Sequence, residues 1–171
     1  FDPPGVWDSE GGIELYTTTN YLKAIDELIE YFGNRPTLLV GHSRGGAVAM
    51  LSAANNTKVS GIVPILASYG APSSPKPSTI EAGFELDYRD LPPGDEKTDE
   101  QKEFSLPLNY FQDGEQYNPG EALKKVEAPK LLIISKQDEF MEVDDVMTTI
   151  GQSPDPKSVY DIVCEHDYRY H

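Results

Sequence analysis

Short apolar runs alternate with amphipathic stretches along much of the chain. Residues 37–40 and 130–135 are apolar runs too short for helices, and they predict buried strands. Residues 20–32 instead repeat apolar side chains at helical spacing, which predicts an amphipathic helix capped by Thr19 or Asn20. Because helical segments separate the strand segments, the strands are expected to run parallel. The pattern predicts an α/β fold, a mostly parallel sheet with flanking helices.

Four further segments fit the same scheme. Residues 44–54 and 142–150 predict helices, and residues 59–67 and 158–164 predict strands. Pro64 counts against the strand at 59–67, because proline cannot donate a hydrogen bond to a sheet and is found mainly at sheet edges or bulges.

The sharpest chemical signal lies between the strand at 37–40 and the helix that follows it. A Gly-x-Ser-x-Gly pattern is formed there by Gly41, His42, Ser43, Arg44 and Gly45. A serine on such a strand-to-helix turn adopts a strained backbone conformation that exposes its hydroxyl, and side chains at the two glycine positions would collide with backbone. The pattern makes Ser43 a candidate nucleophile. The alternative is a structural turn that happens to carry a serine.

With its Gly-His-Ser-x-Gly-Gly turn the chain resembles the α/β-hydrolase family, specifically the branch of serine esterases, lipases and aminopeptidase-like enzymes. The resemblance implies a catalytic triad in the chain order serine, acid, histidine. It also implies that the backbone N–H of Arg44 donates to an oxyanion hole. The Arg44 side chain itself is expected to face solvent or to join an ion pair.

Candidates for the other triad members follow two predicted strands. Asp138 comes directly after the strand at 130–135, where open α/β sheets collect functional groups, and Glu139 is its local competitor. A turn or helix-capping role is the structural alternative for Asp138. His166 follows the last predicted strand and is the candidate general base, with a surface histidine as its alternative.

The N-terminal segment has the composition of a loop. Residues 1–12 contain two prolines and three glycines. They are similar to the loop after the fourth strand of α/β-hydrolases, which implies that strands 1 to 4 precede Phe1. The loop after strand 3 normally supplies the second oxyanion N–H in that family, so this donor is expected outside the chain.

The middle of the chain differs in character from both ends. Residues 71–128 are rich in proline, charge and scattered aromatic side chains. In the family that the chain resembles, insertions at this point form a cap over the nucleophile. We therefore expect a hydrolase core at 1–70 and 129–171 and a cap at 71–128, with Tyr110 and Phe111 as candidate substrate contacts. The alternative is that these aromatic residues anchor the segment to a small core of its own.

Composition narrows the possible partners. With 171 residues and 38% hydrophobic content, the chain can bury one sizeable core. Its net charge of −15 opposes binding to nucleic acid or to an anionic membrane. The single cysteine, Cys164, excludes an internal disulfide and favours the cytoplasm, although the chain starts with Phe1 and could have lost a leader. No metal-ligand spacing or phosphate-binding loop predicts a metal or cofactor.

Together these features predict a serine hydrolase that cleaves a carboxylic ester of a small-molecule acyl substrate through an acyl-enzyme. A peptidase or amidase of the same architecture is the nearest alternative. A binding protein that keeps the fold without catalysis is the other.

Overall fold

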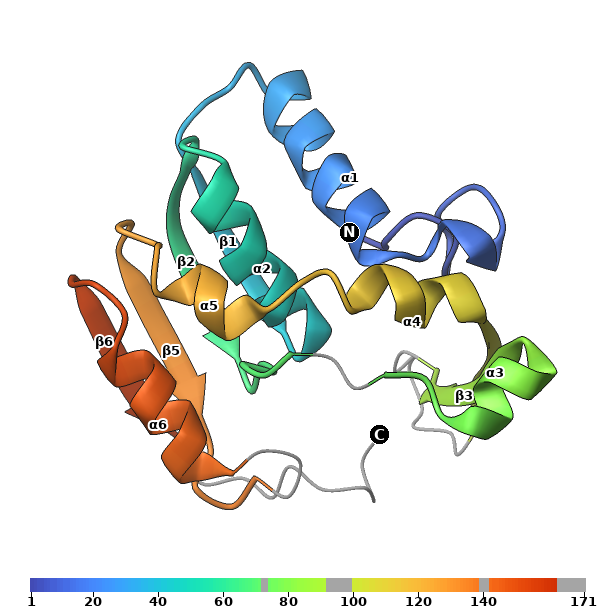
Figure 1. Cartoon of the computed structure of the whole chain (residues 1–171). Helices are drawn as coiled ribbons and strands as arrows, with labels where there is room; N and C mark the ends of the chain where they lie inside the picture. The colour runs from blue at the N-terminus through green and yellow to red at the C-terminus, as the bar shows by residue number, and fades with distance from the viewer. Residues whose placement is uncertain (72–73, 92–99, 139–141, 163–171) are drawn as a thin grey trace.

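The computed structural model describes residues 1–71, 74–91, 100–138 and 142–162 of the 171-residue chain (Figure 1). The first half of this described part contains η1 (Ile13–Leu15), α1 (Thr18–Tyr31), β1 (Thr37–His42), α2 (Arg44–Asn55), β2 (Val59–Ile65) and α3 (Pro77–Ala82). The second half contains β3 (Phe84–Asp90), β4 (Gln101–Pro107), α4 (Leu108–Gly114), α5 (Pro119–Leu123), β5 (Lys130–Ile134), α6 (Val143–Gly151) and β6 (Lys157–Asp161).

Four strands form the main sheet. Their order is β1-β2-β5-β6, and every neighbouring pair is parallel. Helix α2 packs against β1 and β2 and is flanked by α1 and α5, as Figure 1 shows. The predicted α/β class with a mostly parallel sheet is confirmed. Because all four strands run the same way, the residues that follow them lie along one edge of the sheet.

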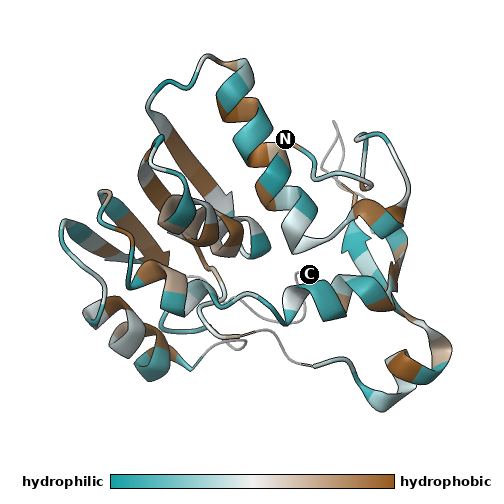
Figure 2. Ribbon diagram, turned by 45° about the horizontal axis from the view of Figure 1, so that its top comes forward, coloured by the Kyte–Doolittle hydropathy of each residue, from teal (hydrophilic) through white to brown (hydrophobic). Residues whose placement is uncertain are grey.

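The main core lies between this sheet and its helices. Its largest fully buried members include Met50 on α2, Ile62 on β2 and Leu132 on β5. The other face of the sheet is open, since Leu38 and Val40 of the edge strand β1 are 60% and 62% exposed. In Figure 2 the central strands of the main sheet are largely brown while the helices alternate brown and teal, as expected for helices with one buried face.

Helix α1 begins earlier than the sequence pattern predicts. Its N-cap is Thr17, whose Oγ1 accepts the Asn20 N–H at 3.1 Å, so the prediction of Thr19 or Asn20 as the cap is wrong. Three consecutive threonines can all serve as caps by their chemistry. Thr19 instead contacts α4, where the Asp113 carboxylate accepts the Thr19 N–H at 2.9 Å.

Strand β2 contains a proline although it lies inside the sheet. Pro64 is opposite Gly41 of β1, and the N–H groups of Ile62 and Leu66 donate to β5 and its flanking backbone at 3.0 and 2.9 Å. Alternate residues of a strand aim their N–H groups at the same neighbour, so Pro64 leaves a gap in the β2–β5 ladder. The strand survives because the bonds on both sides of the gap remain.

Residues between the main-sheet strands β2 and β5 form more regular structure than their composition suggests. Strands β3 and β4 pair as an antiparallel hairpin, and α4 follows directly. Val6, Phe104 and Leu106 are buried together there, with Trp7, Ile13, Tyr16, Tyr110 and Phe111 packed around them. We call this group the cap cluster. Leu123 and Val126, further along, belong to the main core. The division into a core and a cap at 71–128 stays a prediction.

In the part of the chain that the structure describes, no helix combines the length and the apolar character needed to cross a bilayer.

Candidate functional site

Ser43 occupies a strained turn between β1 and α2. Its φ of 50° and ψ of −119° lie in a region that residues other than glycine rarely adopt, and such strain typically costs about 1–3 kcal/mol. The Ser43 N–H donates to the carbonyl of Ile65 at 2.9 Å, which fastens the turn to β2. The carbonyl of Ser43 accepts the Gly46 and Ala47 N–H groups, which starts α2. The turn therefore presents Ser43 at the strand end, as the sequence predicts.

Only one of the two glycines that flank Ser43 in the pattern is required by the backbone. A Cβ on Gly41 would lie 2.3 Å from the carbonyl of Gly45, a contact that backbone cannot relieve. At Gly45 the nearest atom would be the Tyr21 hydroxyl at 3.7 Å, so the expected backbone collision at this position is wrong. The tight position is Gly46, where a Cβ would meet Ala67 at 2.7 Å. The close approach of α2 to β2 thus falls one residue later than the pattern suggests.

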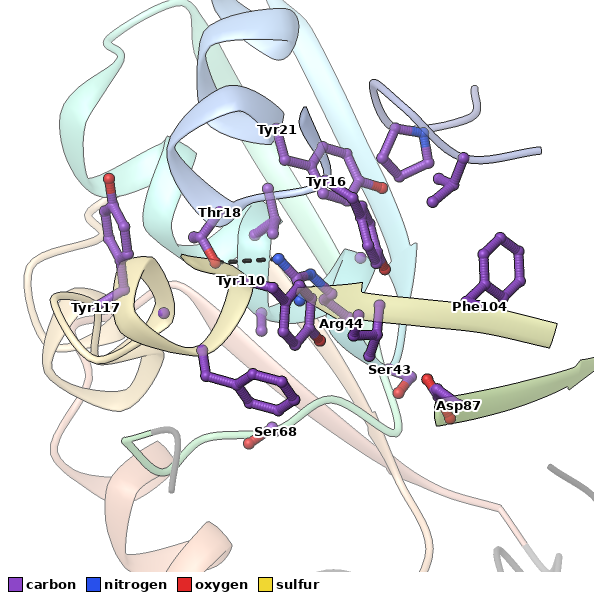
Figure 3. A pocket seen from close by; sticks show the side chains of 18 of the residues that line it. Tyr16, Thr18, Tyr21, Ser43, Arg44, Ser68, Asp87, Phe104, Tyr110 and Tyr117 are labelled. Atoms are coloured by element: carbon purple, nitrogen blue, oxygen red, sulfur yellow. Dashed lines mark hydrogen bonds between the residues drawn. The ribbon is translucent and has the colours of Figure 1, made fainter. Parts of the chain in front are cut away.

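A cavity of about 580 Å³ opens at the Ser43 turn (Figure 3). Its walls come from the N-terminal segment, the start of α1, the β3–β4 hairpin and α4, and they include Tyr16, Ser43, Asp87, Phe104, Tyr110 and Phe111. The candidate nucleophile and the two candidate substrate contacts therefore line the same space. That Tyr110 and Phe111 touch a substrate stays a prediction.

The side chain of Arg44 enters this cavity. Its guanidinium carbon lies 4.5 Å from the ring centroid of Tyr16 and 4.3 Å from that of Tyr110. One guanidinium nitrogen, Nη2, donates to the Thr18 hydroxyl at 3.2 Å, the dashed line in Figure 3. The side chain is partly buried, and it forms no ion pair with any described residue. The expectation of a solvent-facing or ion-paired arginine is therefore wrong.

Tyr16 and Tyr21 beside Arg44 remain neutral at physiological pH. Burial raises the pKa of Tyr16 to about 12, an effect that the nearby Arg44 charge only partly offsets. Burial also raises the pKa of Tyr21. Neither phenol can supply a negative charge against the guanidinium near pH 7.

A second arginine in the cavity wall already has a partner. Arg89 Nη1 lies 2.6 Å from Asp87 Oδ1 within β3. Lys102 on the neighbouring strand lies over the ring of Trp7, 5.1 Å from its centroid. The hairpin therefore adds paired and stacked charges to the cavity region.

The candidate acid follows β5. Asp138 lies in a turn, and its backbone N–H donates to the Ser135 carbonyl at 3.3 Å. A small pocket beside Asp138 is lined by Tyr69 and Val146, among other residues. In the order β1-β2-β5, one strand separates the Ser43 end from the Asp138 end, a spacing of about 10 Å between strand axes. His166, Glu139 and Cys164 lie outside the described residues. The triad stays a prediction.

Sequence reasoning missed the polar wall of the cavity. Thr18, Asp87 and the Arg44 side chain all line it, and none was identified as a functional residue. Along β3 the sequence alternates the apolar residues Phe84, Leu86 and Tyr88 with the charged residues Glu85, Asp87 and Arg89. That alternation was the available signal for a hairpin. Among the described residues, no three histidine, cysteine, aspartate or glutamate side chains gather as metal ligands would.

Solved structures with this fold include several hydrolases. A ferulic-acid complex of Est1E from Butyrivibrio proteoclasticus is 21% identical over 94% of this chain, with a TM-score of 0.68. A crystal structure of a protein from Agrobacterium vitis is 18% identical over 94% of the chain, with a TM-score of 0.69. The monoacylglycerol lipase of Paleococcus ferrophilus is 17% identical over 85% of the chain, with a TM-score of 0.60. The chain spans 65% of the length of each of these three structures.

A search of curated proteins gives no match to the chain. A family model, in contrast, matches residues 1–166, which is nearly the whole sequence. Its description, the alpha/beta hydrolase family, agrees with the parallel sheet, with the similar solved structures and with the resemblance inferred from the Ser43 turn. The chain belongs to the alpha/beta hydrolase family.

Proposed function

We propose that this chain carries the reactive part of a serine hydrolase that cleaves carboxylic esters, with Ser43 as its nucleophile. The observation that carries the proposal is the strained backbone of Ser43 at the N-terminus of α2. Ser43 lies in the wall of a cavity of about 580 Å³. Strain of this kind is kept at functional sites because it presents a side chain that relaxed backbone would turn away.

In the proposed reaction His166 removes the proton from the Ser43 hydroxyl, and the oxygen attacks the ester carbonyl carbon. The tetrahedral intermediate collapses as the alcohol leaves with the proton that His166 returns to it. Water, deprotonated by the same imidazole, then releases the acid and restores the Ser43 hydroxyl. Asp138 would hold the imidazole in the required tautomer and stabilise its charged form.

The start of α2 suits the charge that this reaction develops. The first N–H groups of a helix have no intrahelical acceptor, and the helix dipole is positive at this end. The Arg44 N–H, directly after the nucleophile, is the proposed oxyanion donor, and such a donor is typically worth about 3 kcal/mol of barrier. Tyr110 and Phe111 are proposed to contact the acyl or alcohol group.

An ester is favoured over an amide by the similar structures. Most of their titles that name a reaction name a monoacylglycerol lipase, two metagenome-derived lipolytic enzymes or an esterase domain of Rhodothermus marinus, whereas one names an E-2-(acetamidomethylene)succinate hydrolase. Each is under 25% identical to this chain, so the likeness supports the class of reaction and leaves the substrate to experiment.

The test is hydrolysis of p-nitrophenyl butyrate by the full-length protein. Ser43→Ala is expected to lower kcat by at least about 1,000-fold, because removing a nucleophile leaves only binding and oxyanion effects. A fluorophosphonate probe should label Ser43, and Ser68→Ala, which changes another serine of the cavity, should still be labelled. Turnover that Ser43→Ala leaves unchanged contradicts the proposal. Faster cleavage of the matching anilide would instead favour a peptidase or amidase.

A further inference from the structure

The guanidinium of Arg44 is unusual in how little of its hydrogen-bonding capacity is used. It carries five N–H donors, and the described residues supply one acceptor, the Thr18 hydroxyl. Its Nε is fully buried and has no hydrogen-bond partner. The rings of Tyr16 and Tyr110 both lie against it from neighbouring directions, with centroids 5.4 Å apart, so the rest of its N–H donors remain for other contacts.

Within the part of the chain that the structure describes, no free carboxylate in the cavity lining compensates the positive charge of this group. Tyr16 is neutral because burial raises its pKa to about 12. Asp87 supplies the carboxylate among the described residues of the cavity lining, and it already forms an ion pair with Arg89 at 2.6 Å. A charge withdrawn from water is costly unless it meets an opposite charge. The arrangement thus leaves a place for an anion.

The edge of a guanidinium is suited to one anion above others. It presents parallel N–H groups whose spacing matches the two oxygens of a carboxylate. Arg44 is adjacent to Ser43 in the chain, and both line the same cavity. A carboxylate held by this edge would therefore lie close to an ester bond presented to Ser43.

We propose that the substrate of this hydrolase carries a carboxylate, which the Arg44 guanidinium binds. The inference rests on the proposed function and makes it more specific. It concerns one compact anion, because a protein of net charge −15 repels polyanions at long range. The competing role is structural, since the same side chain joins the N-terminal segment, the start of α1 and α4 through Tyr16, Thr18 and Tyr110.

The first experiment compares 4-acetoxybenzoate with its methyl ester, two substrates with the same acetyl ester and different charge. Release of the phenol is measured with the full-length protein. Wild type should prefer the anion, and Arg44→Gln should lower the anion-to-neutral ratio of kcat/KM at least about tenfold, the effect of losing one hydrogen bond to a charged group. The loss should appear mainly in KM.

Matched variants separate binding from folding. Arg35→Gln removes an exposed arginine away from the cavity and should leave the ratio unchanged. Arg44→Lys keeps the charge and loses the planar fork, so its ratio should fall between those of wild type and Arg44→Gln. If Arg44→Gln does not fold, the lowered ratio in Arg44→Lys carries the test.

The second experiment does not depend on catalysis. Calorimetric titration of Ser43→Ala with 4-acetoxybenzoate should show tighter binding than with the methyl ester, and adding Arg44→Gln should remove the difference. This result would support the anion site even if Ser43→Ala retained turnover and the proposed function failed.

Two results would overturn the inference and leave the hydrolase proposal standing. One is a wild-type enzyme with no preference for the anion in either turnover or binding. The other is an Arg44→Gln variant whose activity falls equally on both substrates and whose melting temperature also falls. The guanidinium would then have a structural role alone.

Discussion

The main core and the cap cluster are built in different ways. The main core buries aliphatic side chains such as Met50, Ile62 and Leu132 between the sheet and its helices. Among its described members the cap cluster buries only Val6, Phe104 and Leu106, none of them completely, and it relies on aromatic contacts, for example Trp7 edge-on to Phe104 at 5.3 Å between centroids. Many close aliphatic contacts stabilise one region, and a few large rings stabilise the other.

This difference matches the division of work around the cavity. The strained turn of Ser43 leads into α2, whose residues from Ala47 to Met50 belong to the main core, and dense packing there can hold an unfavourable backbone in place. Many of the residues that line the cavity come from the N-terminal segment, β3, β4 and α4. Reaction geometry thus depends on the well-packed region, and selectivity can change in the other region at less cost to the fold.

The largest expected effect is on stability, from removing one leucine in each region. Leu132→Ala should lower the free energy of unfolding by about 4 kcal/mol, because Leu132 is fully buried among packed neighbours. Leu106→Ala should cost about 2 kcal/mol, because the cap cluster can collapse into the smaller volume. Urea denaturation at matched temperature measures both values.

The two leucine variants should also differ in activity. Leu106→Ala is expected to change KM for esters, since Leu106 lines the cavity, whereas Leu132→Ala should act through the folded fraction alone. Equal losses of stability would show that the two regions form one evenly packed body.

The second effect is a fall in stability at high pH, caused by the tyrosine beside Arg44. Burial raises the pKa of Tyr16 from 10.0 to about 12, so the unfolded chain loses its proton first as pH increases. Stability should be constant below pH 10 and should fall between pH 10 and 12, by up to about 2.7 kcal/mol for this group.

Tyr16→Phe is the matched control, because it keeps the ring over Arg44 and removes the titrating hydroxyl. The unfolding free energy of this variant should fall less between pH 10 and 12 than that of wild type. Part of the fall will remain, since burial also raises the pKa of Tyr69. A slope identical to that of wild type would argue against the burial of the Tyr16 hydroxyl.

The smallest effect concerns the contact between α1 and α4, which we call the joint between the two regions. The Asp113 carboxylate of α4 accepts the N–H and hydroxyl of Thr19, in the first turn of α1. Asp113→Ala should cost about 1 kcal/mol, as loss of a helix-capping side chain usually does. Glu30→Ala removes an exposed carboxylate from the other end of α1 and should change the unfolding free energy by less than about 0.5 kcal/mol. A cost for Asp113→Ala no larger than this would mean that the joint contributes nothing.

Local patterns were sufficient for the elements of the main sheet. Apolar runs predicted β1 and β5, and small residues after Ser43 predicted α2, because these segments have one strongly preferred way to bury themselves. The sequence predicts no strand within residues 84–90 and 101–107. They form the β3–β4 hairpin, since each strand is stabilised mainly by its partner across the charged stretch between them.

The sequence alone determined the fold class, the family and the place of Ser43, because hydrophobic periodicity and a strained glycine-flanked turn are local properties. Only the tertiary structure decided what surrounds that turn. The sequence predicts Arg44 in solvent or in an ion pair, whereas it packs against Tyr16 and Tyr110, which are 28 and 66 positions away in the printed sequence. Contacts between such distant residues depend on how whole elements pack, and no local pattern encodes them.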